Sequence, residues 1–393
     1  PMLILAGTML HVLGLVLFFF LFGLDRTWVP VVYYVWLGMA FAIAVSQFWT
    51  YANQVFDPRQ ARRLFAFIGA GGLLGSVLGG GMAVKVTRLA GTRFTLLGAA
   101  AILLVVPVLV IFIERARGEN RSVPIKKTRR SRYEEARGGL RTLRGSRLLG
   151  LIALLMLATV MVGKLVDWQF YWYVEQYTEA LDQRTSVIGY AFILMGVVGF
   201  LFQLIFTGRI HRALGVAVGM RILPGTVAVA SFAVVVAVAV GSPAVYPLVW
   251  VLMLSEGSLR HSVDQATREL LFLPVAEELR VRAKAFIDVF VQRFGKGAAA
   301  ILILVTIKFF SPSFVGVLTF VLAVSWLAIT IKARRKYITA FREGLKSGLI
   351  QPVARIDPSD VTTVTTLVQS LGSSDPRRVL HSLDLLADSG QGQ

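Results

Sequence analysis

The sequence predicts an all-α membrane protein built as a bundle of transmembrane helices, and three observations lead to this prediction. Of the 393 residues, 56% are hydrophobic, and the mean hydropathy is +0.69. About ten apolar stretches approach or exceed the roughly 18–20 residues that cross a bilayer as a helix. The basic residues are concentrated in alternate loops between these stretches, as expected when cytoplasmic loops carry an excess of Lys and Arg.

The predicted spans are the uninterrupted apolar runs of the sequence. They occupy residues 2–24, 29–51, 64–86, 94–113, 148–174, 186–206, 214–240, 244–256, 283–308 and 313–331. The eighth is short, and we expect it to continue through Arg260 towards Asp264. The basic loops are at 57–63, 115–147, 209–221, 260–284 and 332–346. The positive-inside rule therefore predicts that the central loop and the C-terminal tail are cytoplasmic.

The basic segment 115–147 divides the chain into a half-bundle of four spans at 1–114 and a bundle of six at 148–336. A short internal repeat indicates two related halves, since the motif around Asn53-Gln54 recurs around Asp264-Gln265. Chance similarity between apolar helices is the alternative. Parallel repeats of six spans are one transporter plan, and on that plan two further spans precede Pro1.

The last segment, 337–393, changes in composition. Residues 332–349 are basic and amphipathic, which predicts a helix on the inner membrane surface. After a linker, 361–371 and 376–387 read as two short helices that resemble one HEAT-type repeat, with an ordinary helical hairpin as the alternative. One repeat cannot bury its own apolar face, so we expect further repeats after Gln393 and a protein partner for this tail.

Composition and motifs exclude several classes of function. The net charge of +19 belongs to membrane-flanking loops and does not indicate a nucleic-acid partner. The chain has no cysteine, and its four histidines lack metal-ligand spacing. We find no phosphate-binding loop, paired carboxylates or nucleophile motif in the sequence. The prediction is a protein that is not an enzyme and has no cofactor or metal, with the lipid bilayer as its main partner.

The fifth span carries Lys164 and Asp167, which are three residues apart and share one helix face. At 1.5 Å per residue from Arg147, Lys164 lies past the middle of the membrane. Charged groups at this depth usually mark a substrate or ion path. The pair is a candidate anion contact, in which substrate displaces Asp167 from Lys164; a purely structural ion pair is the alternative.

The ninth span carries a second candidate group. Asp288, Gln292 and Lys296 recur every four residues and share one face, and Arg293 lies one step round the helix. Lys296 is near the membrane midplane, where transporter sites usually lie. The planar fork of Arg and the compact charge of Lys together suit a phosphate-bearing substrate. The alternatives are a structural lysine and an arginine that extends to the membrane surface.

Three more sets complete the candidate residues. Glu256 can pair with Arg260 four residues on. Further candidates for an inner gate, with helix-end solvation as the alternative, are Arg260, Asp264, Gln265 and Arg268. Asn53 and Gln54 offer polar groups from the first half. Gly71, Gly75 and Gly79 recur every four residues, which favours close packing of another helix.

Three sequence motifs resemble a known family. The segment GRIHRALG at 208–215 resembles the cytoplasmic turn of the major facilitator superfamily, although the usual acidic residue is absent. ANQVFDPRQARRLFAFIGAGG, together with DQATRELLFLP and RAKAFIDVFVQRFGKG, is similar to the nucleotide translocase branch of that superfamily. The resemblance covers residues 2 to about 336, and the tail resembles bacterial relatives fused to HEAT repeats.

This resemblance implies a secondary transporter that works by alternating access in a bacterial inner membrane. The implied cargo is an anionic phosphorylated solute such as a nucleotide, with ATP/ADP-type exchange. One alternative is a carrier of another small solute, proton-coupled through Asp167, Glu256 or Asp288. The other is a membrane-anchored scaffold or sensor that uses its HEAT-like tail.

Overall fold

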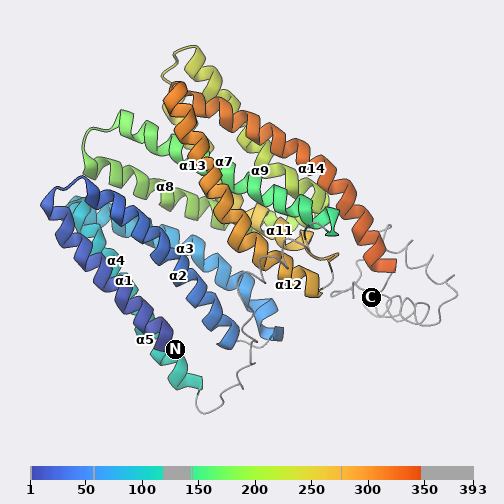
Figure 1. Ribbon diagram of the computed structural model, residues 1–393, viewed down its shortest axis with the longest axis horizontal. Coiled ribbons are helices and arrows are strands. Elements are labelled where there is room, and N and C mark those ends of the chain that lie inside the picture. Colours follow the sequence, from blue (N-terminus) through green and yellow to red (C-terminus); the bar gives the residue numbers. More distant parts are fainter. Residues whose placement is uncertain (1, 56–57, 118–142, 144, 276, 347–393) are drawn as a thin grey trace.

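A computed structural model describes residues 2–55, 58–117, 143, 145–275 and 277–346. Every regular element within these ranges is a helix, which confirms the predicted all-α class. Eight stretches of the described chain are long and apolar enough to cross a membrane. The protein is therefore a polytopic helical membrane protein (Figure 1).

The first half of the chain forms a layer of five helices in the described residues. Its helices are α1 (Met2–Leu21), α2 (Trp28–Val55), α3 (Pro58–Ala90), α4 (Thr95–Leu103) and α5 (Val105–Arg117). The predicted fourth span is thus interrupted at Leu104, three residues before Pro107. A small core, which includes Leu15 and Phe18, joins α1 to α4.

The second half is a larger bundle. Its helices are α7 (Arg147–Tyr177), α8 (Leu181–Phe202), α9 (Gly208–Ala239), α10 (Val245–Leu259), α11 (Gln265–Leu271), α12 (Glu277–Phe286), α13 (Gln292–Phe309) and α14 (Phe314–Lys346). Three wider π-helical turns interrupt it, namely η3 (Gln203–Thr207), η4 (Arg260–Asp264) and η5 (Ile287–Val291).

The boundary between the sixth and seventh predicted spans lies at Gly215. The apolar stretch Leu181–Ala239 contains α8 and α9 without a loop between them. Gly215 breaks the helix there with φ 72° and ψ 172°, a backbone conformation that glycine adopts at little cost. The predicted turn at 209–221 is therefore a glycine kink rather than an extended loop.

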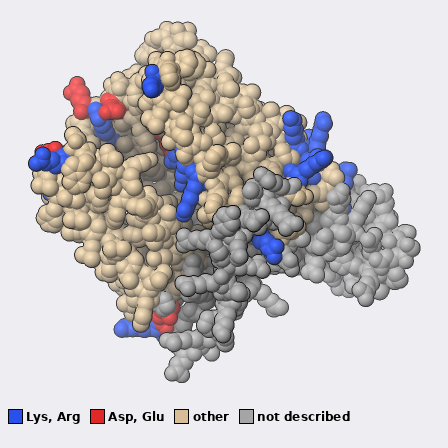
Figure 2. Space-filling model, in the orientation of Figure 1, with Lys and Arg blue, Asp and Glu red and all other residues tan. Residues whose placement is uncertain are grey.

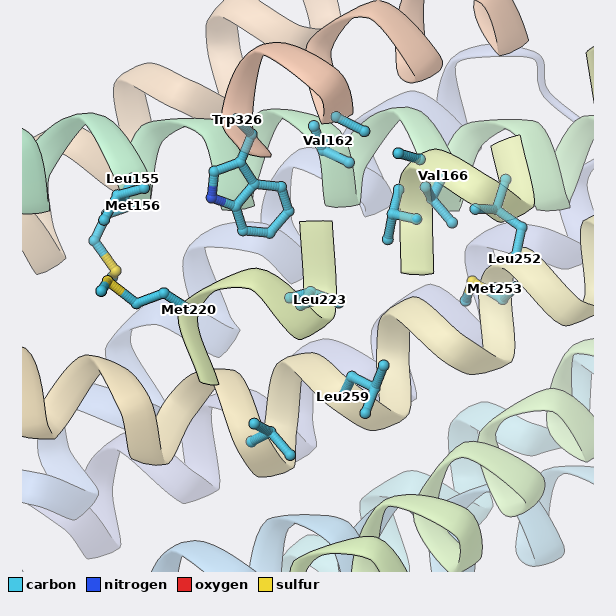
Figure 3. Packing of buried hydrophobic residues seen from close by; sticks show 14 of the residues in the cluster. Leu155, Met156, Val162, Val166, Met220, Leu223, Leu252, Met253, Leu259 and Trp326 are labelled. Atoms are coloured by element: carbon cyan, nitrogen blue, oxygen red, sulfur yellow. The ribbon is translucent and has the colours of Figure 1, made fainter. Parts of the chain in front are cut away.

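The main hydrophobic core lies around α7. Half of the most apolar window of α7 is buried, compared with 6% for α2. Trp326 of α14 is 2% exposed and belongs to one buried cluster with residues of α7, Leu223 of α9 and Leu252 of α10 (Figure 3). Because α7 is held on several sides, it is a rigid support for the charged residues that it carries.

The two halves meet through α3 and α8, which lie side by side (Figure 1). At the end of the molecule that carries the turn between α3 and α4, the Thr92 backbone N–H donates to Asp182 Oδ1 at 2.7 Å. Nearby, Arg88 Nη2 donates to the Tyr190 hydroxyl at 2.6 Å. These polar contacts hold the halves together at this end of the molecule.

The glycines that permit this close packing are not the predicted ones. A Cβ atom added at Gly80 would lie 2.5 Å from the carbonyl oxygen of Gly189, whereas one added at Gly71, Gly75 or Gly79 would meet nothing within 4 Å. The four-residue glycine pattern is therefore on a neighbouring face of α3. The α3–α8 contact instead uses Gly80 together with Gly189 and Gly196 of α8.

We expect Gly80→Leu to lower the free energy of unfolding by about 1–3 kcal/mol or more, because overpacking forces backbones apart. Gly75→Leu is the matched control on the same helix, and it should fold normally because Gly75 faces open space. Thermal unfolding of both purified variants in detergent is the measurement. Equal stability of the two variants would contradict the packing described here.

The C-terminal end of the bundle also differs from the prediction. α14 continues as one helix from Phe314 to Lys346, through the expected segment boundary at 336. The basic residues from Lys332 onwards thus extend the last transmembrane helix and do not start a separate surface helix. The HEAT-like segment at 361–387 and most of the basic loop 115–147 lie outside the described residues.

Candidate functional site

The site is built first on α7. Its N-terminus is capped by Ser146, whose hydroxyl accepts a hydrogen bond from the Leu149 backbone N–H at 3.4 Å. Further along, Lys164 Nζ donates to Asp167 Oδ2 at 2.5 Å, and the two side chains are 42% and 13% exposed. The predicted pair is therefore formed, and the lysine remains the more accessible partner.

A second pair lies against α7 at Gly163. Arg260 Nη1 is 3.4 Å from Glu256 Oε1, and the Glu256 side chain is only 1% exposed. A Cβ atom at Gly163 would lie 2.5 Å from Arg260 Nη1 and 2.9 Å from Glu256 Oε1. Because Gly163 has no side chain, the Glu256–Arg260 pair fits against α7 beside Lys164.

Charges of alternating sign continue from α10 through η4 into α11. Asp264, 8% exposed, pairs with Arg268 at 3.2 Å, and Arg268 Nη1 contacts Met156 Sδ at 3.5 Å. Arg260 and Asp264 are the two ends of the π-helical turn η4, an irregularity often found at functional sites. Gln265 is exposed. Of the predicted gate residues, Asp264 and Arg268 therefore pair with each other in this conformation, and Arg260 pairs with Glu256.

The third element is α13 with η5. Lys296 and Arg293 are exposed, and Gln292 Nε2 donates to Asp288 Oδ1 at 3.2 Å. Lys296 interacts electrostatically with groups on both other elements, namely Lys164, Asp167, Arg260 and the neighbouring Arg293. The structure therefore brings together side chains from α7, η4 and α13 that are far apart in the sequence.

Asp288 belongs to a neighbouring group of charges rather than to the cluster formed by Lys164, Arg260 and Lys296. Its electrostatic partners are Lys284, Glu269 and Arg268, and Lys284 Nζ also pairs with both Glu269 oxygens at 2.7 Å. Asp288 therefore lies on the α11–α12 side of the site. It is eight residues, or about two helical turns, from Lys296, with Gln292 between them.

The predicted contribution of Asn53 and Gln54 from the first half stays a prediction. Asn53 and Gln54 are in the last turn of α2, and their side chains are outside the described part of the chain. Tyr171 of α7 lies close enough to Asp167 and Arg260 for their charges to act on it. No pattern distinguishes Tyr171 from the other aromatic residues of this span, so sequence reasoning missed it.

The cluster has a surplus of positive charge. Its cationic side chains are Lys164, Arg260, Arg293 and Lys296, and its carboxylates are Asp167 and Glu256. Figure 2 shows basic side chains within the hollow between the two halves, beside α13. Among the described residues, no group of three metal-ligating side chains is present. The cluster is suited to holding an anion.

A helical membrane bundle with a cluster of cationic side chains facing the hollow between its halves is the arrangement expected of a solute transporter. Residues 13–337 match the family of TLC ATP/ADP transporters, and the chain belongs to this family. It is also similar to ADP,ATP carrier protein 1 of Chlamydia pneumoniae, with 23% identity over 353 residues, covering 80% of this chain and 68% of the relative. The three cationic elements lie within the matched range.

Proposed function

We propose that this protein is a secondary carrier that exchanges nucleotides, ATP for ADP, across a membrane. The observation that carries the proposal is the convergence of Lys164, Arg260 and Lys296 from three separate elements, in a chain of the TLC ATP/ADP transporter family. A nucleotide presents phosphates with several negative charges, and charge-assisted hydrogen bonds from Lys and Arg suit them. The family match favours this function over carriage of an unrelated solute or a scaffold role.

The proposed roles follow from the exposure of each group. Lys296 and Arg293 are exposed and accept the phosphates first. Lys164 then leaves Asp167 and turns to the cargo. Arg260 is 21% exposed and is held by buried Glu256, so it serves as a fixed charge at the base of the site. Gln292 can donate to the phosphates from the same face of α13 as Lys296.

We propose alternating access between two halves of the major facilitator type, at 1–114 and 148–336. The contact between α3 and α8 supports this proposal, because it is the closest packing between the halves in the described chain. In this conformation Asp264 pairs with Arg268, and Gln265 is exposed. In the opposite state the site is closed at the end where Asp264, Gln265 and Arg268 lie. There these residues act as an inner gate, because Asp264 and Arg268 leave each other and bind partners on the first half.

The proposed orientation has the basic ends of the helices in the cytoplasm of a bacterium, at the inner membrane. Because the chain has no cysteine, a single introduced cysteine reports on one position. We expect Ala180→Cys to react with impermeant thiol reagents from outside, and Lys336→Cys only from the cytoplasmic side; both positions are exposed. Thr178 is unsuitable because it is buried. Labelling with the sides exchanged would reverse the proposed orientation.

The tail from 347 to 393 lies outside the described residues, so the HEAT-like repeat and its protein partner remain proposals from the sequence. They do not enter the transport mechanism.

Counter-exchange in liposomes is the test of the proposed function. Liposomes with the purified protein and internal ADP should accumulate labelled ATP, whereas those without internal nucleotide should accumulate little. Liposomes loaded with AMP, phosphate or glutamate in place of ADP show which internal solutes the protein exchanges for ATP. Equal uptake with and without internal nucleotide would exclude obligatory exchange, and uptake driven only by a proton gradient would favour a proton-coupled carrier.

A further inference from the structure

An apolar groove lies between α7 and the helix pair α12–α13, away from the charged site. Its volume is about 460 Å³ and its walls are Gly150, Ala153, Leu154 and Leu157 on α7, with Phe286, Phe290, Val291 and Phe294 opposite. No polar or charged side chain lines it. Phe290, Phe294 and Leu154 are 42%, 68% and 41% exposed, so the groove is open at its side.

The groove and the nucleotide site lie on different flanks of α13. Phe286, Phe290 and Phe294 recur every four residues, and so do Asp288, Gln292 and Lys296 two positions further on. Two residues correspond to about 200° around a helix, so the two rows face in nearly opposite directions. Gly295 lies between the rows and packs against Leu157 and Val160 of α7. The groove therefore faces the surface of the bundle rather than the hollow between the halves.

The walls are shaped for a flexible hydrocarbon chain. The Phe286 and Phe290 rings are stacked at 5.1 Å between centroids, and they form one smooth wall along the helix direction. Leu154 and Leu157 are one turn apart on the opposite wall, where Gly150 and Ala153 leave room at the end nearest Arg147. A narrow apolar channel parallel to the helices accommodates an extended chain better than a compact polar ligand.

Two arginines flank that same end. Arg147 is three residues before Gly150 on α7, and Arg282 is four residues before Phe286 on α12. Each is therefore about one helical turn beyond the apolar wall. Both are exposed, and within the described residues neither has an ion-pair partner. The groove thus changes from apolar to cationic where the bundle meets the membrane surface.

We propose that this groove is a binding site for an anionic phospholipid, with one acyl chain along the phenylalanine wall and the phosphate between Arg147 and Arg282. The planar guanidinium group binds phosphate oxygens through two parallel hydrogen bonds. Basic pockets between transmembrane helices on the side with basic loops bind anionic lipid headgroups. The site is independent of the nucleotide site, because it shares no residue with it.

The test is fluorescence quenching by brominated lipids. Phe290→Trp places a reporter in the groove, and the parent protein corrects for its seven native tryptophans. In phosphatidylcholine vesicles, brominated phosphatidylglycerol should quench the reporter at a mole fraction roughly tenfold lower than brominated phosphatidylcholine. Leu154→Trp is the second reporter, on the opposite wall, should the first variant not fold.

The arginines are tested with a matched pair of controls. In the reporter background, Arg147→Gln with Arg282→Gln should remove the preference for phosphatidylglycerol. Arg334→Gln with Arg335→Gln removes two exposed charges from α14, outside the groove. This control variant should keep the preference for phosphatidylglycerol. Equal quenching by the two lipids in the parent reporter would show ordinary boundary lipid and overturn the proposal. No quenching by either lipid would show that a protein segment fills the groove, which would also overturn it.

Discussion

Arg260→Gln should lower the free energy of unfolding by about 3–5 kcal/mol, the usual effect of removing one partner from a buried ion pair. Glu256 is 1% exposed, and its described ion-pair partner is Arg260. Neither Glu256 oxygen has a hydrogen-bond partner among the described residues. The substitution leaves this carboxylate buried and uncompensated. Lys164 is nearby, but its ammonium can replace Arg260 only by leaving Asp167. Chemical denaturation in mild detergent, followed by circular dichroism, is the measurement.

Two comparisons separate this explanation from a general sensitivity of the bundle. The double variant Glu256→Gln with Arg260→Gln should recover most of the lost stability, since no buried charge remains. Arg184→Gln removes the partner of Glu175, which is 57% exposed, and it should cost at most about 1 kcal/mol. If Arg260→Gln is as mild as Arg184→Gln, the Glu256–Arg260 pair does not support the fold.

Lys296→Gln should weaken ATP binding by at least tenfold, or about 1.5–3 kcal/mol for a lost hydrogen bond to a charged group. Lys296 is exposed to the hollow, and its ammonium is the charge that interacts with both Lys164 and Arg260. Bound phosphate offsets the mutual repulsion of these cations. Lys296→Arg should restore only part of the affinity, because a planar fork does not replace a compact charge. Calorimetric titration of the purified protein with ATP is the measurement.

Lys308→Gln is the matched control on the same helix. Lys308 is at the other end of α13, over the Phe309 ring at 5.6 Å, and its loss should leave ATP affinity unchanged. Lys164→Gln should have a smaller effect than Lys296→Gln, because Lys164 is already paired with Asp167. If folded Lys296→Gln binds ATP as the parent does, Lys296 is structural and the proposed phosphate site is wrong.

Much of the candidate site follows from the sequence because charged groups are costly inside a membrane. Lys164, Asp167, Glu256 and Arg260 stand out in apolar runs, and helical spacing alone predicts the two pairs that these four residues form. Spacing could not show that Gly163 is the point of contact between those pairs. That contact depends on how α10 lies against α7, and a periodic pattern within one helix carries no information about its neighbour.

The sequence by itself determined the helical class, the approximate spans and the charged residues within them, because hydrophobic runs and helical period are local properties. The tertiary structure alone decided which faces meet. Gly71, Gly75 and Gly79 form the more regular pattern, yet Gly80 makes the close approach, because the rotation of α3 about its axis is set by α8. In the same way, Lys296 joins Lys164 only because α13 packs along α7. Packing between helices depends on the shapes of both surfaces, and one sequence pattern describes only one of them.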